Sequence, residues 1–200
     1  MDLQPLVAKT FQSLADALSD LTAAQADAAS LCEEWNVRNV VAHMTMAARY
    51  GPDEFTAELQ QDGFDFGRLS NRIAARDGAL PFDRLLTDLR SDAMAHWAPP
   101  QGGFAGALTH VVIHGLDVTV PLGLPRSASD EAMRHVLDGL TEGEVHRHFG
   151  TSIDGVRLEA TDIDWAYGDG RTVKGEAQDI ALALCGRRSR ALPWPEPRGE

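Results

Sequence analysis

Two histidines placed four residues apart in an apolar segment constrain this chain more than any other feature. The segment that carries His110, His114 and Asp117 has the pattern of a helix that is apolar nearly all round. Positions i and i+4 lie about 40° apart on a helix, so the two imidazoles share one narrow stripe. Two imidazoles in this arrangement can bind the same metal ion. The segment therefore predicts part of a metal site, with a further ligand from elsewhere in the chain.

His43 is the predicted third ligand. It follows Asn36, a predicted N-cap, in a helix whose apolar residues repeat at helical spacing, and it lies on the core side of that helix. A single histidine in such a place is more often a buried, hydrogen-bonded core residue, but the pair at 110 and 114 favours a ligand. A catalytic metal site has three protein ligands and an open fourth position. We therefore expect His43, His110 and His114 to form one.

Asp117 follows His114 by three residues and can accept a hydrogen bond from its imidazole, which would fix the tautomer. A role as a ligand, or only as a local cap, stays open. Cys32 has no base beside it in the sequence, so we do not predict a nucleophile there. The remaining histidines are predicted to be structural or exposed: His96, His135, His146 and His148.

Charge and composition exclude several classes of partner. The 200-residue chain has a formal net charge of −12, so phosphate repulsion argues against nucleic acid and anionic membranes. Hydrophobic residues make up 44% of the chain, which is enough for a packed core. The chain shows no signal peptide and no apolar run of membrane-spanning length. Its two cysteines form no metal or disulfide motif, so we expect a protein of the reducing cytoplasm.

The spacing of apolar residues predicts a mainly α chain. From residue 155 the period changes to two, Gly168-Asp169-Gly170 predicts a hairpin turn, and a last helix follows at 176–185. We expect a helical domain at 1–150, a small ββα domain at 151–188 and a proline-rich tail at 189–200. Gly51-Pro52 is predicted to interrupt a helix. The other predicted helices lie at 3–19, 37–48, 66–75, 82–97, 104–120 and 130–143.

Two runs in the helical part carry a resemblance to a known family. These are Cys32-x-x-Trp35-x-Val37-x-x-Val40-Val41-Ala42-His43 and His110-x-x-x-His114-Gly115-x-Asp117. Near the end, Leu158-Glu159-Ala160-Thr161-Asp162, Gly168-Asp169-Gly170 and Gly186-Arg187 add to it. The chain resembles the DinB-like metalloenzymes, in the branch of mycothiol-dependent maleylpyruvate isomerase.

The resemblance implies a four-helix bundle that holds one divalent metal through His43, His110 and His114. Zinc is the first expectation, with nickel or iron as alternatives. It also implies mycothiol as cosubstrate, and a C-terminal arginine, matched by Arg187, that approaches the metal. The chain departs from the isomerase in two respects: His110 stands where the isomerase has a glutamate, and the C-terminal part is shorter. An all-histidine triad resembles the metal-dependent thiol transferases of the superfamily.

These features predict an enzyme that joins a low-molecular-weight thiol to a small electrophile, or isomerises that electrophile by addition and elimination. The metal would stabilise the thiolate, and Arg187 would hold a carboxylate. Two alternatives stay open. A non-catalytic metal-binding or ligand-binding module would have Asp117 or Cys32 as a fourth ligand, and a metal-dependent hydrolase would have a base such as Glu34. We expect a monomer or a homodimer.

Overall fold

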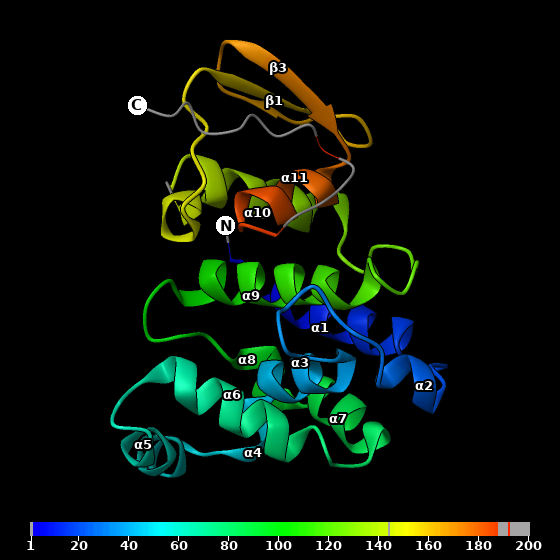
Figure 1. Cartoon of the computed structure of the whole chain (residues 1–200), viewed down its shortest axis with the longest axis vertical. Coiled ribbons are helices and arrows are strands. Elements are labelled where there is room, and N and C mark those ends of the chain that lie inside the picture. Colours follow the sequence, from blue (N-terminus) through cyan, green and yellow to red (C-terminus); the bar gives the residue numbers. More distant parts are fainter. Residues whose placement is uncertain (1, 144, 188–191, 193–200) are drawn as a thin grey trace. The chain divides into compact units, whose positions relative to one another are not determined.

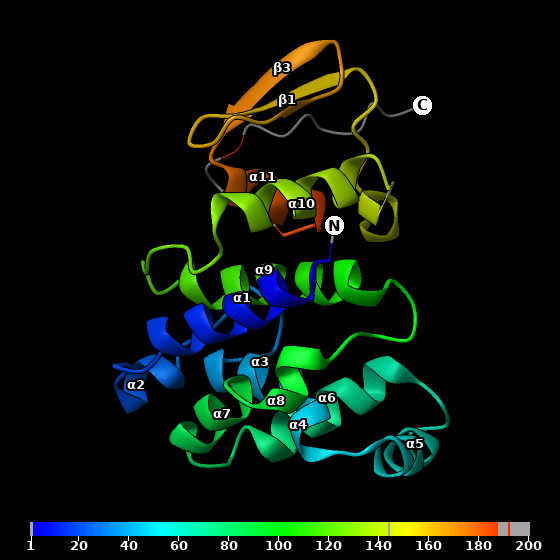
Figure 2. The ribbon, with the colours of Figure 1, turned by 180° about the vertical axis from the view of Figure 1, so that it is seen from behind.

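The chain folds into helices and one small sheet in a computed structural model that describes residues 2–143, 145–187 and 192 (Figures 1 and 2). Two compact units divide it, Met1–Ser127 and Ala128–Glu200. The division falls after Ser127, whereas the sequence places a boundary after residue 150. Among the described residues, no helix combines the length and the apolar character that a membrane crossing needs.

The N-terminal unit is all helical, and its four-helix bundle confirms the predicted fold class. Helix α1 packs against α7, α8 and α9, while α3 packs against α6, α7 and α9. The four members of the bundle are therefore α1, α3, the pair α7 and α8, and α9. Both views show α9 alongside α1 (Figures 1 and 2). The helices of this unit are α1 (Gln4–Ala17), α2 (Ala23–Ala26), α3 (Val37–Met44), α4 (Met46–Arg49), α5 (Pro52–Gln61), α6 (Phe66–Asp77), α7 (Phe82–Leu89), α8 (Asp92–His96) and α9 (Gly103–Thr119).

Apolar faces at helical spacing build the core between these helices. Each fully buried leucine or phenylalanine stabilises the fold by about 1.5–3 kcal/mol relative to exposure. The face of α9 that carries Leu108, Val112 and Leu116 is buried, as its spacing predicts. The other helices of the bundle contribute Phe11 and Leu14 from α1, Val40 and Val41 from α3, and Leu85 and Leu89 from α7.

Local signals place the start of α3. The Asn36 side chain accepts a hydrogen bond from the Asn39 N–H at 3.0 Å, and the Asn39 side chain accepts one from the Asn36 N–H at 3.1 Å. This capping box confirms Asn36 as the N-cap. Asn39 also donates to the Ala74 carbonyl at 2.9 Å, which joins α3 to α6. A Cβ at Gly78 would lie 2.3 Å from the Asn39 amide nitrogen, so this approach requires a glycine.

The predicted interruption at Gly51-Pro52 is confirmed, because α4 ends at Arg49 and Pro52 occupies the first turn of α5, where proline is favoured. One predicted helix in this unit is wrong. The helix predicted to run from 82 to 97 is two helices, because Ser91 accepts a hydrogen bond from the Met94 N–H and starts α8 as its N-cap.

The C-terminal unit contains α10 (Asp130–Thr141), a 3₁₀ turn at Val145–Phe149, a three-stranded sheet and α11 (Ala177–Leu184). Its central strand is β1 (Val156–Ala160), which pairs antiparallel with β2 (Ala166–Tyr167) and parallel with β3 (Arg171–Gly175). The predicted hairpin at Gly168-Asp169-Gly170 is therefore wrong, since the strands it joins lie on opposite edges of the sheet. Of the predicted tail, only Leu192 lies within the described residues, and it is buried.

Candidate metal centre

The structure brings the three predicted ligands together. His43 comes from the last turn of α3, and His110 and His114 come from successive turns of α9. The ring centroids are separated by 5.3 Å between His43 and His110, 5.0 Å between His43 and His114, and 4.8 Å between His110 and His114. One nitrogen from each ring lies within 4.8 Å of the other two. Two separate helices thus aim three imidazoles at one point.

Burial keeps two of these imidazoles neutral. The pKa of His43 falls from 6.5 to about 3, first through burial and then through repulsion from the nearby His114, while Asp117 acts in the opposite direction. Burial also holds the pKa of His110 well below 6.5, with added repulsion from His114 and His43. A neutral imidazole carries a nitrogen lone pair, which is the form that binds a metal.

The hydrogen bonding of the cluster is incomplete. Among the described residues, Nδ1 of His43 and Nε2 of His110 are buried without a hydrogen-bond partner. Leaving a buried polar atom unpaired costs about 1–3 kcal/mol, and native proteins contain few such atoms. Among the described residues, three imidazole nitrogens lie around one point and two of the rings have an unpaired buried atom, which fits a divalent cation that accepts imidazole ligands.

Asp117 lies behind His114. Its Oδ2 is 3.0 Å from Nδ1 of His114, and the residue has no exposed surface. A carboxylate in this place favours the tautomer with the proton on Nδ1, which leaves Nε2 for a metal. The contact is the one that the spacing of His114 and Asp117 predicts.

Cys32 adjoins the same carboxylate, which the sequence does not suggest. Its thiol donates to Oδ2 of Asp117 at 3.0 Å, and its sulfur is 3.7 Å from Nδ1 of His114. The backbone N–H of Leu31 also donates to the carbonyl of Asp117 at 3.0 Å. Cys32 therefore has both an acid and a base beside it, although both are more than 80 positions away along the chain.

Aromatic rings surround the three histidines. The ring of Trp35 lies 4.8 Å from that of His43, Phe66 lies 6.3 Å from His43, and Trp97 lies 5.0 Å from His110, all between centroids. The indole of Trp35 is held by a 3.0 Å hydrogen bond to Asn71. These rings help to exclude water from His43 and His110, which contributes to the desolvation that lowers the pKa values of these two residues.

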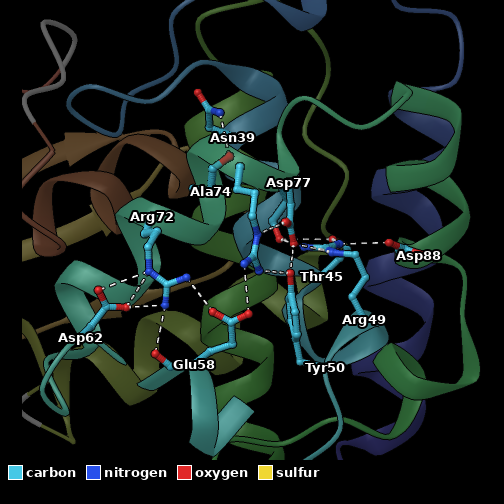
Figure 3. A network of polar contacts seen from close by, with 12 residues as sticks. Asn39, Thr45, Arg49, Tyr50, Glu58, Asp62, Arg72, Ala74, Asp77 and Asp88 are labelled. Atoms are coloured by element: carbon cyan, nitrogen blue, oxygen red, sulfur yellow. Dashed lines mark hydrogen bonds and ion pairs between the residues drawn. The ribbon is translucent and has the colours of Figure 1, made fainter. Parts of the chain in front are cut away.

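A buried ion-pair network holds the end of α3 that carries His43 (Figure 3). Arg49 donates to Asp77 at 2.9 Å and to Asp88 at 3.0 Å, and all three side chains are at most 7% exposed. Its guanidinium also donates to the carbonyl of Ala42, the residue before His43. Arg49 thus binds a carbonyl in the last turn of α3 and anchors that turn.

Arg187 and Glu34, the other residues predicted to act, have different surroundings. The guanidinium of Arg187 donates to the Cys185 carbonyl at 3.0 Å and lies 5.9 Å from the ring centroid of Phe149. These contacts fit an arginine at a helix C-terminus, and its approach to the histidines stays a prediction. Glu34 is exposed and has a left-handed backbone, with φ of 65°.

The remaining histidines have the surroundings that the sequence predicts for structural or exposed residues. Nδ1 of His146 lies 2.8 Å from the Leu140 carbonyl in a buried position, and Nδ1 of His96 lies 3.0 Å from the Asp92 carbonyl at the surface. His148 is exposed, and His135 is partly buried on α10.

Comparison with known proteins agrees with this architecture. Residues 7–100 match the family model of the mycothiol maleylpyruvate isomerase N-terminal domain, a range that includes His43 and ends before α9. No curated protein matches the chain.

Two solved structures share the fold. A mycothiol-dependent maleylpyruvate isomerase is 15% identical with a TM-score of 0.60, and a histidine-to-alanine mutant of such an isomerase is 14% identical with a TM-score of 0.59. Each match covers 98% of this chain and 94% of the other. Over residues 7–100, the chain is similar to the mycothiol maleylpyruvate isomerase N-terminal domain, and over nearly its whole length it shares the fold of the isomerase structures.

Proposed function

We propose that this protein is a metal-dependent enzyme that uses a low-molecular-weight thiol, with mycothiol the first candidate. The enzyme would either transfer this thiol to a small electrophile or use it to isomerise the electrophile. The observation that carries the proposal is the convergence of His43, His110 and His114, with unpaired buried nitrogens on two of the rings. The match of residues 7–100 to the mycothiol maleylpyruvate isomerase N-terminal domain supports the choice of thiol.

His43, His110 and His114 would hold the cation, and zinc, nickel and iron all accept three imidazoles. When bound, a divalent cation would supply a Lewis acid that lowers the pKa of a coordinated thiol. The protein residues do the rest. Asp117 holds the proton on Nδ1 of His114, and Trp35 and Trp97 keep water from the histidines.

The contacts of Asp117 and Cys32 favour an enzyme over a binding module. A structural metal site would be closed by a fourth protein ligand, and these two residues are the candidates. They bind each other at 3.0 Å, and the carboxylate takes Nδ1 of His114. This arrangement supports a fourth position left for a substrate thiol.

In the proposed reaction, the thiol sulfur bonds to one carbon of an activated carbon–carbon double bond, the π bond breaks, and the thiol proton goes to the other carbon. Transfer would stop at this adduct. Isomerisation would continue by rotation about the carbon–carbon bond that is now single; loss of the carbon-bound proton would then re-form the double bond, and the thiolate would leave and take up a proton. Arg187 is proposed to hold a substrate carboxylate, because a guanidinium binds a carboxylate through two parallel hydrogen bonds. Because His110 replaces the isomerase's glutamate, transfer and isomerisation both stay open.

We also propose that the protein works in the cytoplasm, where its two cysteines would stay reduced, as a monomer or homodimer. A hydrolase that uses the exposed Glu34 as a base is the second enzyme class to test.

Mass spectrometry of the zinc-loaded protein, incubated with mycothiol or glutathione and a panel of electrophiles, tests the proposal. We expect a thiol adduct or an isomerised product that forms only with the thiol present and is lost in His110→Ala. Absence of a product with every thiol, from a protein that binds zinc, would favour the binding module. A product that forms without any thiol would favour the hydrolase.

A further inference from the structure

The segment at residues 30–35 is attached to the histidine cluster at two points. At one end, Leu31 and Cys32 bind the carbonyl and the carboxylate of Asp117, each at 3.0 Å. At the other end, the ring of Trp35 lies 4.8 Å from that of His43. The segment thus contacts the site beside α9 and beside α3.

Hydrogen bonds within the segment keep these two ends in register. The Trp35 N–H donates to the Cys32 carbonyl at 3.2 Å, and the hydroxyl of Ser30 donates to the Trp35 carbonyl at 2.8 Å. The Cys32 N–H donates back to the Ser30 hydroxyl at 3.1 Å. Glu34 takes a left-handed backbone conformation to close the turn. The position of Cys32 is therefore determined by the turn and is not that of a loose surface thiol.

The thiol and the imidazole meet the same oxygen. Cys32 donates to Oδ2 of Asp117, and Nδ1 of His114 lies 3.0 Å from that atom. A carboxylate with no exposed surface needs donors on its oxygens, and each donor restricts its rotation.

We propose that Cys32 is a positioning residue whose thiol fixes the Asp117 carboxylate and, through it, the ring orientation and tautomer of His114. The role rests on the proposed function, because His114 is one of the three proposed ligands. It assigns Cys32 neither to the metal nor to bond formation with substrate.

Zinc affinity of the full-length protein, measured by competition with a chelator, tests the role. We expect Cys32→Ala to weaken zinc binding about tenfold, at the lower end of the effects of outer partners of metal ligands. Cys32→Ser keeps a donor and should restore most of the affinity. Cys185→Ala, the same substitution at the chain's other cysteine, should leave zinc affinity unchanged.

Two spectroscopic measurements report on the site itself and would not change if a substitution only destabilised the fold. Nitrogen-15 NMR of the metal-free protein should show His114 with its proton on Nδ1 in the wild type and Cys32→Ser, and a shift towards the other tautomer in Cys32→Ala. The cobalt-loaded wild type should lack a sulfur-to-cobalt charge-transfer band.

Equal zinc affinities and equal tautomers in the wild type and Cys32→Ala would overturn the role. A charge-transfer band that disappears in Cys32→Ser would also overturn it, by making Cys32 a ligand. A wild type that binds neither zinc nor cobalt would contradict the proposed function. In that case the NMR experiment still tests the role of Cys32: an unchanged His114 tautomer in Cys32→Ala would contradict this role, and a shifted tautomer would support it.

Discussion

Two groups of buried polar side chains meet at α3 in the N-terminal unit, and they differ in how fully they are paired. Around Arg49, the two carboxylates of Asp77 and Asp88 receive hydrogen bonds from several guanidinium groups and from Tyr50 (Figure 3). Around His43, two rings keep buried nitrogens without a partner among the described residues. Both groups are desolvated, so burial alone does not distinguish them.

The difference lies in what each group lacks. The Arg49 network pairs opposite charges, and its members satisfy one another, which is typical of a group that stabilises a fold. In the histidine group, Nδ1 of His43 and Nε2 of His110 find no partner among the described residues, so this group lacks a partner that a bound cation can supply. The first region explains how the end of α3 is held, and the second indicates what the protein binds there.

Breaking the Arg49 network should have the largest effect. Arg49→Met leaves Asp77 and Asp88 buried with less compensating charge, so we expect the free energy of unfolding to fall by about 3–5 kcal/mol. Urea denaturation of the metal-free protein measures this loss. The matched control is Arg68→Met, at an arginine whose side chain is 76% exposed and whose ion pair should contribute below about 1 kcal/mol. Equal losses in the two variants would contradict a structural role for the network.

Removing one histidine should abolish the response to zinc. Zinc at 100 times its dissociation constant should raise the free energy of unfolding of the wild type by about 2.7 kcal/mol. The same zinc concentration should have no such effect on His110→Ala, whereas the surface variant His96→Ala should respond like the wild type. Denaturation with and without zinc measures the difference. Equal stabilisation of His110→Ala and the wild type would rule out His110 as a ligand.

The metal-free protein should lose stability between neutral pH and pH 5. Because the folded pKa of His43 is about 3 and its ordinary value is 6.5, the unfolded chain binds more protons in this range. Stability then falls as pH falls, by up to about 1.4 kcal/mol per pH unit for each such histidine.

His43→Gln should remove one histidine's share of this slope, which denaturation at pH 7, 6 and 5 in chelator can measure. The Arg49 network should add little in this window. Burial raises the pKa of Asp77, but hydrogen bonds from Tyr50, Arg76 and Arg49 outweigh it and hold the pKa below 3.8. An unchanged slope in His43→Gln would mean that His43 is not held neutral.

The smallest effect should come from the opposite end of α3. Asn36→Ala removes the side chain that accepts from the Asn39 N–H, and losing such a cap costs about 1 kcal/mol. Thr22→Ala, at the cap of α2, should cost a similar amount. Neither variant should change zinc affinity by as much as Cys32→Ala does, which separates helix stability from site geometry.

Local patterns in the sequence predict the parts of the site that lie within single helices. The spacing of His110, His114 and Asp117 places them on one stripe of α9, and the buried face of α3 includes His43. The helix cap at Asn36 is also a local signal, and the structure confirms it.

Contacts between distant segments could not be predicted in this way. Cys32 meets Asp117 across 85 positions and Arg49 meets Asp88 across 39, and no periodicity links them. The prediction of the hairpin fails for the same reason, because β3 pairs in parallel with β1 and not with its neighbour in sequence, β2. The packing of the helices and strands determines which distant polar side chains come into contact in the interior.

Anomalous X-ray scattering at the zinc edge, from crystals of the full-length protein soaked in zinc, tests the central claim most directly. The account predicts one peak about 2.0–2.1 Å from a nitrogen of each of His43, His110 and His114. It also predicts that Cys32 and Asp117 remain bound to each other away from the ion. No peak between the three rings, or a peak bound to Cys32 and Asp117 instead, would contradict it.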